Sequence, residues 1–325
     1  MSDAIKAIEI TEFGGPDKLT LVSRPTPVPQ AGEICVRLSA IGINMADTYQ
    51  RTGLYPVPLP SGMGNEGAGI IEAIGDGVST LSVGQRVAFV MATGAYAEAI
   101  TMPASSAIPL PDAVSDQQAA AILLKAMTVD YLFNDTYPLH GGETVLFHAA
   151  AGGVGLIACQ WAKHLGVRLI GTAGTAQKCA LAKQNGADDC FILESPTLAD
   201  DLHRVSDGGF SIIYDSVGQS TYELSLNALA AFGTLASFGN ASGPIEAVSP
   251  AQLASLGSLR FTRPTLVTYL MQPGWMQQSA ARIFDLMAQG ALRAEIHQTY
   301  ALEDAAQAHR DLEGRKTTGC SLILP

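Results

Sequence analysis

Cysteine is scarce in this sequence, and its spacing is uninformative for any metal or redox motif. Five cysteines are scattered over 325 residues, and none stands in a Cys-x-x-Cys pair. Their odd number and irregular spacing argue against a disulfide framework and against a thiolate metal site. They are Cys35, Cys159, Cys179, Cys190 and Cys320.

Long apolar runs and positive charge are also missing. No stretch approaches the roughly 20 apolar residues that cross a bilayer, and residues 1–9 contain no continuous apolar segment, so neither a membrane span nor a signal peptide is expected. The formal net charge of −11 repels phosphate backbones and disfavours nucleic acid as a partner. We therefore predict a cytoplasmic protein that does not act on membranes or nucleic acids.

What is present indicates a large folded chain of two domains. With 47% hydrophobic and 15% charged residues, the chain can bury a substantial core, and its length exceeds that of a typical single core. Up to about residue 125, short β-like runs are broken by Gly and Pro, which predicts a barrel-like β domain. The C-terminal segment, with helices expected at 279–289 and 302–313 and a strand at 320–324, is expected to return to it.

From about residue 126, short apolar runs alternate with helical patterns, as in βαβ units with a parallel sheet. The fold class predicted here is α/β with a doubly wound parallel sheet. Helices are expected at 155–165 and 176–184. The expected strands are 144–148, 168–172, 189–193, 211–215, 234–238 and one near 259–262.

The strongest motif is a loop of small residues after the first of these strands. Ala150, Gly152 and Gly155 occupy the three positions of the dinucleotide fingerprint, with Gly153 and Val154 between the last two. Small residues are needed because backbone N–H groups at a helix N-terminus must approach a pyrophosphate closely. The alternative, a tight strand–helix turn without a ligand, is disfavoured because a second strand follows at the right distance.

The end of the second strand indicates which dinucleotide binds. An NAD site usually places Asp or Glu there for the ribose 2′-hydroxyl, but residues 171–178 contain no carboxylate. Lys178 supplies a cation for a 2′-phosphate, so NADPH is the expected cofactor. The alternative interpretation of Lys178 is an ordinary solvated helix residue.

Several segments together resemble a known family. The chain resembles the zinc-free quinone oxidoreductase branch of the medium-chain dehydrogenase/reductase superfamily, the branch that includes zeta-crystallin. The resemblance implies a GroES-like catalytic domain (residues 1–125), a Rossmann NADPH-binding domain (126–265) and a return to the catalytic domain (266–325). It also implies a homodimer formed through the edge of the Rossmann domain. The segments that carry it are 42–49, 53–56, 147–155, 214–218 and 237–240.

The resemblance also implies roles for individual residues. Tyr49 and Tyr55 match positions that line the substrate cleft, and Arg315 matches a C-terminal cofactor contact. One departure is Leu193, because close relatives often carry Tyr beside the adenosine ribose. The positions that match the nicotinamide side are Asn44, Asp47, Lys125, Thr128 and Asn240, those on the adenosine side are Gly174, Thr175 and Lys178, and Ser216, Phe238 and Gly239 lie in matching cofactor segments.

The positions that bind zinc in related alcohol dehydrogenases hold amides here. Where those relatives carry a Cys and a Gly-His-Glu, this chain has Asn44 and the run Gly-Asn-Glu at 64–66, and the four-cysteine lobe is missing. Without thiolate or imidazole, zinc loses ligands that it needs. The six histidines show no metal-ligand spacing, and His148 is read as a strand-end side chain. No metal is therefore expected.

Without a Lewis acid, the expected substrates are quinones or related electrophilic conjugated carbonyls, which accept hydride into an extended π system. Asn44 and Tyr49 are candidate donors to the developing oxyanion, and Asp47 is read as an orienting group. The alternative for the tyrosines is packing at a domain edge. Alternative functions are a 2-alkenal or enoyl-thioester reductase and, without enzymatic activity, an NADPH-binding crystallin-like or RNA-associated protein.

Overall fold

The computed structural model describes residues 4–325, which form two compact units. The first unit comprises residues 4–124, Ala280–Ala288 and Arg293–Pro325, and the second comprises Lys125–Ser279 and Gln289–Leu292. Part of the N-terminal stretch in which no signal peptide is expected, residues 1–3, lies outside the described chain. Among the described residues, no helix is long and apolar enough to cross a membrane.

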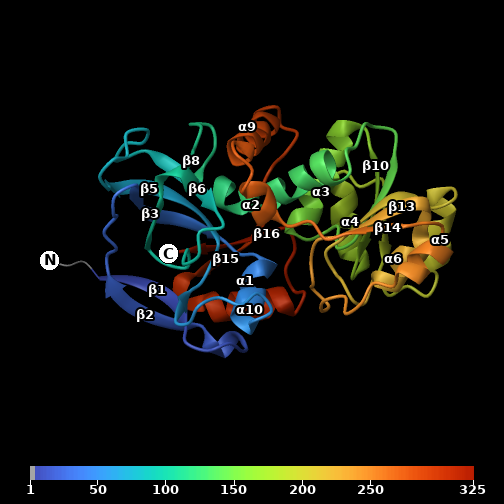
Figure 1. Cartoon of the computed structure of the whole chain (residues 1–325), viewed down its shortest axis with the longest axis horizontal. Helices are drawn as coiled ribbons and strands as arrows, with labels where there is room; N and C mark the ends of the chain where they lie inside the picture. Colours follow the sequence, from blue (N-terminus) through green and yellow to red (C-terminus); the bar gives the residue numbers. More distant parts are fainter. Residues whose placement is uncertain (1–3) are drawn as a thin grey trace. The chain divides into compact units, whose positions relative to one another are not determined.

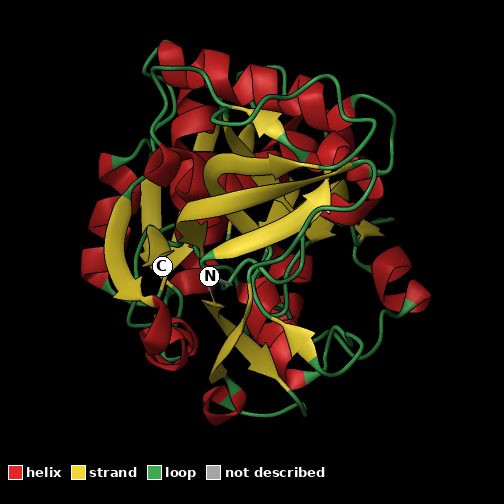
Figure 2. Ribbon diagram, turned by 90° about the vertical axis from the view of Figure 1, so that its left-hand side faces the viewer, coloured by secondary structure: helices red, strands yellow, loops and turns green. Residues whose placement is uncertain are grey.

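The first unit consists mainly of β-strands in two sheets (Figures 1 and 2). The smaller sheet has the order β2-β1-β4, and the larger one has the order β15-β16-β3-β5-β6-β8, with β7 paired to β3. β16 pairs antiparallel with β3, so the C-terminal strand joins a sheet begun by the N-terminal segment. The strands are β1 (Ala4–Ile10), β2 (Thr20–Pro25), β3 (Glu33–Gly42), β4 (Ser61–Gly62), β5 (Glu66–Ile74), β6 (Arg86–Val90), β7 (Ala99–Pro103), β8 (Ile108–Pro109), β15 (Ile296–Ala301) and β16 (Cys320–Leu324).

The helices of the first unit are few, and two of them support the candidate site. α1 (Met45–Thr52) follows β3, and α10 (Ala305–Glu313) contacts α1. α1 ends at Gly53, whose φ of 83° is the left-handed conformation that glycine adopts at helix ends. The remaining short helices are η1 (Pro16–Lys18), η2 (Ala104–Ser106) and η4 (Leu302–Asp304).

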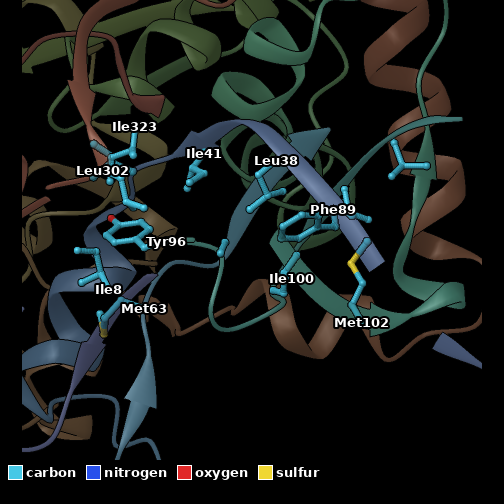
Figure 3. Packing of buried hydrophobic residues seen from close by; sticks show 14 of the residues in the cluster. Ile8, Leu38, Ile41, Met63, Phe89, Tyr96, Ile100, Met102, Leu302 and Ile323 are labelled. Atoms are coloured by element: carbon cyan, nitrogen blue, oxygen red, sulfur yellow. The ribbon is translucent and has the colours of Figure 1, made fainter. Parts of the chain in front are cut away.

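Beside a small cluster of Ile5, Cys35 and Ala99, the core of the first unit is one large apolar cluster drawn from segments far apart in the sequence. Figure 3 shows Ile8, Phe89 and Ile323, from β1, β6 and β16, in this cluster. Alternating side chains of β3 enter it, namely Ile34, Val36 and Leu38. The ring of Tyr96 packs in the same cluster, and its hydroxyl donates to Asp47. Tyr96 therefore connects the apolar core to the polar network described below.

The second unit is a six-stranded, all-parallel sheet with the order β11-β10-β9-β12-β13-β14. Numbered within the unit, that order is 3-2-1-4-5-6, the order of a doubly wound dinucleotide-binding fold. The predicted fold class is confirmed. The strands are β9 (Thr144–Phe147), β10 (Arg168–Ala173), β11 (Asp189–Ile192), β12 (Phe210–Asp215), β13 (Leu229–Ser237) and β14 (Arg260–Thr262).

Helices lie on both faces of this sheet (Figure 1). α3 and α4 contact each other on one face, and α5 and α6 contact each other on the other face. Two longer helices, α2 and α9, have residues in both units. The helices are α2 (Asp116–Asp130), η3 (Tyr131–Thr136), α3 (Gly153–Leu165), α4 (Ala176–Gln184), α5 (Leu198–Ser206), α6 (Tyr222–Ala228), α7 (Pro250–Ser255), α8 (Leu266–Leu270) and α9 (Trp275–Ala288).

The segment of residues 266–279 belongs to a different unit from the one predicted. Residues 266–279 were expected with the catalytic domain, but they belong to the second unit. The reason is aromatic packing: the ring of Tyr269 stacks on Tyr131 with centroids 4.7 Å apart, and Trp275 Nε1 donates to Asp135 Oδ2 at 2.9 Å. The chain therefore enters the first unit within α9, and after Gln289–Leu292, which group with the second unit, it stays in the first from Arg293 on.

Candidate active site and cofactor loops

A hydrogen-bonded network surrounds the N-terminus of α1 in the first unit. Asn44 is the N-cap, and its backbone N–H donates to Asp47 Oδ2 at 2.8 Å, which fixes the first turn. The Asn44 side chain donates through Nδ2 to Glu66 Oε2 at 3.0 Å. Asp47 and Glu66 are completely buried, and Asn44 is nearly so. Asn44, at the first of the metal positions, is therefore held by the glutamate of the Gly-Asn-Glu run that contains the second.

The second amide at a metal position, Asn65, is also held on several sides. Its Nδ2 donates to Asp47 Oδ1 and to Gln50 Oε1, each at 2.7 Å. Its Oδ1 accepts from Gln50 Nε2 at 3.2 Å. Both hydrogens of the Asn65 amide are thus used, and Asp47 receives donors on both oxygens.

A buried chain of neutral donors reaches Asp47 from α10. Tyr96 donates its hydroxyl hydrogen to Asp47 Oδ2 at 3.0 Å, and its oxygen lies 3.1 Å from His309 Nε2. Because the tyrosine hydrogen is used on the carboxylate, His309 must donate from Nε2. Burial lowers the pKa of His309 to about 3, and Arg51 acts in the same direction, so this histidine is neutral.

The two tyrosines predicted to line the substrate cleft lie together on the other side of α1. Their rings meet edge to face with centroids 5.2 Å apart, and the backbone N–H of Tyr55 donates to the carbonyl of Tyr49. Tyr49 is 8% exposed and Tyr55 is 37% exposed. The two rings thus pack against each other, as the packing interpretation expects. Tyr55 is the more accessible of the two to a substrate.

In the second unit, the small-residue loop lies between β9 and α3. Gly152 is the N-cap of α3, and the N–H groups of the first turn have no acceptor within the helix. A Cβ at Gly155 would lie 2.4 Å from the carbonyl oxygen of Ala149 and 2.6 Å from two backbone atoms of Ala150. Ala149 itself has a φ of 56°, a conformation rare for alanine. Close backbone packing, rather than side chains, builds this loop.

Two further loops follow β12 and β13 and contact each other. Buried Asp215 fixes the first by accepting from the N–H groups of Val217 and Gly218 and from the hydroxyl of Thr221. A Cβ at Gly239 would lie 2.4 Å from the carbonyl oxygen of Ser216. The fold therefore brings together the predicted cofactor residues Ser216, Phe238, Gly239 and Asn240, and the ring of Phe238 packs 5.7 Å from that of Phe147 at the end of β9.

The adenosine-side candidates lie at the start of α4. Thr175 is the N-cap, and its hydroxyl accepts from the N–H of Lys178 at 3.2 Å. Leu193 is held at the end of β11 by a backbone bond from its N–H to Ala173. All these loops follow the carboxyl ends of parallel strands, where doubly wound folds bind ligands.

The other predicted site residues lie on connecting segments. Lys125 and Thr128 are buried on α2. Arg315 is exposed just after α10, with a φ of 55°, and belongs to the first unit, whereas the loops above belong to the second. Sequence reasoning missed Gln50, Tyr96 and His309, because nothing in the local sequence connects positions 50, 96 and 309.

The histidines and acidic residues of the described chain form no group of three or more that could hold a metal ion. His148 is a core residue: its Nδ1 lies 2.7 Å from Thr172 Oγ1, its Nε2 lies 3.0 Å from Ser225 Oγ, and burial lowers its pKa. This agrees with the interpretation of His148 as a structural side chain.

Comparison with known proteins identifies both units. The family model "Alcohol dehydrogenase GroES-like domain" matches residues 30–112, and "Zinc-binding dehydrogenase" matches residues 153–285. A quinone oxidoreductase of Pseudomonas aeruginosa is 47% identical over 98% of this chain and 99% of its own length. A 2-haloacrylate reductase of a Burkholderia species is 35% identical over 99% of both chains.

Solved structures give the same result. The structure of Escherichia coli quinone oxidoreductase complexed with NADPH superposes with a TM-score of 0.96 at 44% identity, covering 98% of this chain and 100% of the other. The fold is thus shared with that structure along nearly the whole length of both chains. The chain belongs to the quinone oxidoreductase family of the medium-chain dehydrogenases/reductases.

Proposed function

We propose that this protein reduces quinones with NADPH and without a metal ion. The observation that carries the proposal is the 47% identity to a quinone oxidoreductase over nearly the entire length of both chains. The site supports it, because amides bonded to neighbouring side chains occupy the positions where zinc relatives carry ligands.

The second unit fits a dinucleotide. The loop leaves no space for a side chain at Gly155, so its backbone can approach a ligand closely. The N-terminus of α3 presents N–H groups suited to a pyrophosphate. Bound NADPH supplies a hydride to the acceptor. In this proposal the chain holds NADPH through Ala150 and the residues from Gly152 to Gly155, and Lys178 binds its 2′-phosphate. The other contacts are made by Lys125, Thr128, Gly174, Thr175, Ser216, Phe238, Gly239, Asn240 and Arg315.

On the acceptor side, the proposal assigns Tyr49 and Tyr55 to the substrate and Asn44 to a position between substrate and cofactor. The Asp47 carboxylate accepts hydrogen bonds from the Asn44 backbone, from Asn65 and from Tyr96, so in this proposal it orients these neighbouring groups. A group in this state does not serve as the general acid. The oxygens of a reduced quinone can instead take protons from water.

The test is NADPH oxidation measured across quinones, conjugated enals and enoyl thioesters, before and after exhaustive treatment with a chelator. We expect turnover with quinones, unchanged after chelation. Absence of turnover with every quinone overturns the proposed function, and a rate lost on chelation and restored by zinc overturns its metal independence.

A second candidate is reduction of a conjugated C=C bond, favoured by the relationship to a 2-haloacrylate reductase. This reaction protonates a carbon atom, so a positioned donor contributes about 10²–10⁴-fold. A kcat/KM for enals or haloacrylates above that for every quinone would favour this second candidate.

The proposal includes assembly and location. β14 is one of the two edge strands of the six-stranded sheet, β11 being the other, and its outer backbone edge supports a homodimer through this edge. Light scattering during gel filtration tests it, and a monomeric mass at micromolar concentration would contradict it. The five cysteines all lie among the described residues, are buried and form no disulfide, which supports a reducing cytoplasmic location.

A further inference from the structure

Glu66 is a buried carboxylate to which neither the sequence nor the proposed chemistry assigns a function. It is completely inaccessible to solvent, and both oxygens accept hydrogen bonds: Oε1 from the backbone N–H of Leu124 at 2.6 Å and Oε2 from Asn44 Nδ2 at 3.0 Å. Removing a carboxylate from water is costly unless such donors compensate for it. The Glu66 carboxylate thus bonds to two segments of the chain at once, one at Asn44 and one at Leu124.

The neighbouring strand makes room for this carboxylate. Gly42 of β3 pairs with Glu66 of β5, and a Cβ at Gly42 would lie 2.3 Å from Glu66 Oε2 and 2.3 Å from the carbonyl oxygen of Ala120. Any side chain at position 42 would displace the carboxylate from Asn44. The space for this interaction is therefore built into the backbone and does not depend on a flexible side chain.

The two donors belong to the two helices that carry candidate site residues. Asn44 caps α1, and Leu124 directly precedes Lys125 on α2. We propose that Glu66 is a positioning residue, which fixes the side-chain amide of Asn44 with its nitrogen inward and ties it to α2. The inference rests on the proposed reduction of quinones by NADPH.

The substitution Glu66→Gln tests this bond because it keeps shape and removes one acceptor. The N–H of Leu124 requires an oxygen, so the introduced amide turns its NH₂ group toward Asn44 Nδ2. Two donors then face each other at the distance of a hydrogen bond, and the amide of Asn44 must rotate. We expect kcat with a quinone to fall about tenfold, the equivalent of one hydrogen bond at 1.4 kcal/mol.

The rescue variant exchanges the two chemical groups. In Glu66→Gln combined with Asn44→Asp, the glutamine donates to the aspartate, and the total charge equals that of the parent. Because Asn44 itself belongs to the proposed site, we expect this double variant to stay below the parent in kcat but to exceed Asn44→Asp alone. Glu66→Gln should therefore lower kcat when residue 44 is asparagine and raise it when residue 44 is aspartate. Asn44→Asp alone sets two carboxylates against each other and is expected to be the least active of the set.

The control is Glu143→Gln, because Glu143 also accepts a backbone N–H, that of His140 at 2.8 Å, but lies outside the site. A parent protein that fails to turn over any quinone contradicts the proposed function and not this role. If the parent is active, three results overturn the role of Glu66: unchanged kcat in Glu66→Gln, a double variant no more active than Asn44→Asp alone, or losses of kcat that follow the melting temperature.

Discussion

The loop at Gly155 and the network at α1 are two functional regions built in opposite ways. In the loop, backbone atoms form the surface, and the side chains are small because anything larger would meet the backbone of Ala149 and Ala150. In the network, side chains from α1, β5, α10 and the segment at Tyr96 form the surface, and the backbone only places them. A surface made of backbone atoms requires small residues at neighbouring positions, and this requirement is visible as a local motif in the sequence. A side-chain network leaves no such signal.

The loop should respond most strongly to a single added carbon. Gly155→Ala places a methyl group within 2.6 Å of backbone atoms, so α3 must move away from β9. We expect NADPH affinity to fall at least about a hundredfold, or 2.7 kcal/mol, by calorimetry. As a folding control, Gly174→Ala adds a methyl group with no atom within 4 Å and should retain the melting temperature. Unchanged affinity in Gly155→Ala would show that the loop tolerates side chains.

Lys178 tests whether the second unit also depends on side-chain charge. Lys178→Ala removes a charge-assisted bond to the 2′-phosphate and should weaken NADPH binding by about 1.5–3 kcal/mol, while NADH binding stays unchanged. The control is Lys183→Ala on the same helix, whose ammonium pairs with Asp189 at 3.1 Å. Equal affinities of the parent protein for NADPH and NADH would refute this prediction.

The network should respond to loss of one hydroxyl group. Tyr96→Phe leaves Asp47 without one donor and His309 Nε2 without its acceptor, both in the core. We expect the free energy of unfolding to fall by about 1–3 kcal/mol, as measured by urea titration. Tyr222→Phe is the matched control, because Tyr222 is equally a buried tyrosine but lies in the core cluster of the second unit, away from Asp47 and His309. Similar effects of the two variants would show that the network contributes nothing beyond packing.

The smallest effect is expected at the substrate side of α1. Tyr49→Phe keeps the ring that packs against Tyr55 and removes only the hydroxyl. For quinone reduction we expect kcat/KM to fall by less than about tenfold, or 1.4 kcal/mol, with unchanged NADPH affinity. A thousandfold loss of kcat with both ligands still bound would instead make Tyr49 an essential acid and favour C=C reduction.

Much of the second unit could be predicted from the sequence. All six predicted strands exist with ends shifted by a few residues, and α4 covers the predicted residues 176–184. Parallel strands that are buried on both faces are continuous apolar runs, so their positions along the chain can be recognised in the sequence. The return of the chain was harder to place, because it depends on the stacking of Tyr269 on Tyr131 and on the hydrogen bond from Trp275 to Asp135, and no periodic pattern reveals these contacts.

The sequence by itself determined the fold class, the small-residue loop and the replacement of zinc ligands by amides. Each of these depends on residues near one another in the chain, where backbone geometry limits the choices. Only the tertiary structure decided that Asn44 bonds to Glu66, that Asn65 and Tyr96 share Asp47, and that neutral His309 completes the chain of donors. Hydrogen bonds of this kind depend on angstrom-scale distances between segments up to hundreds of residues apart, and those distances are set only when the core packs.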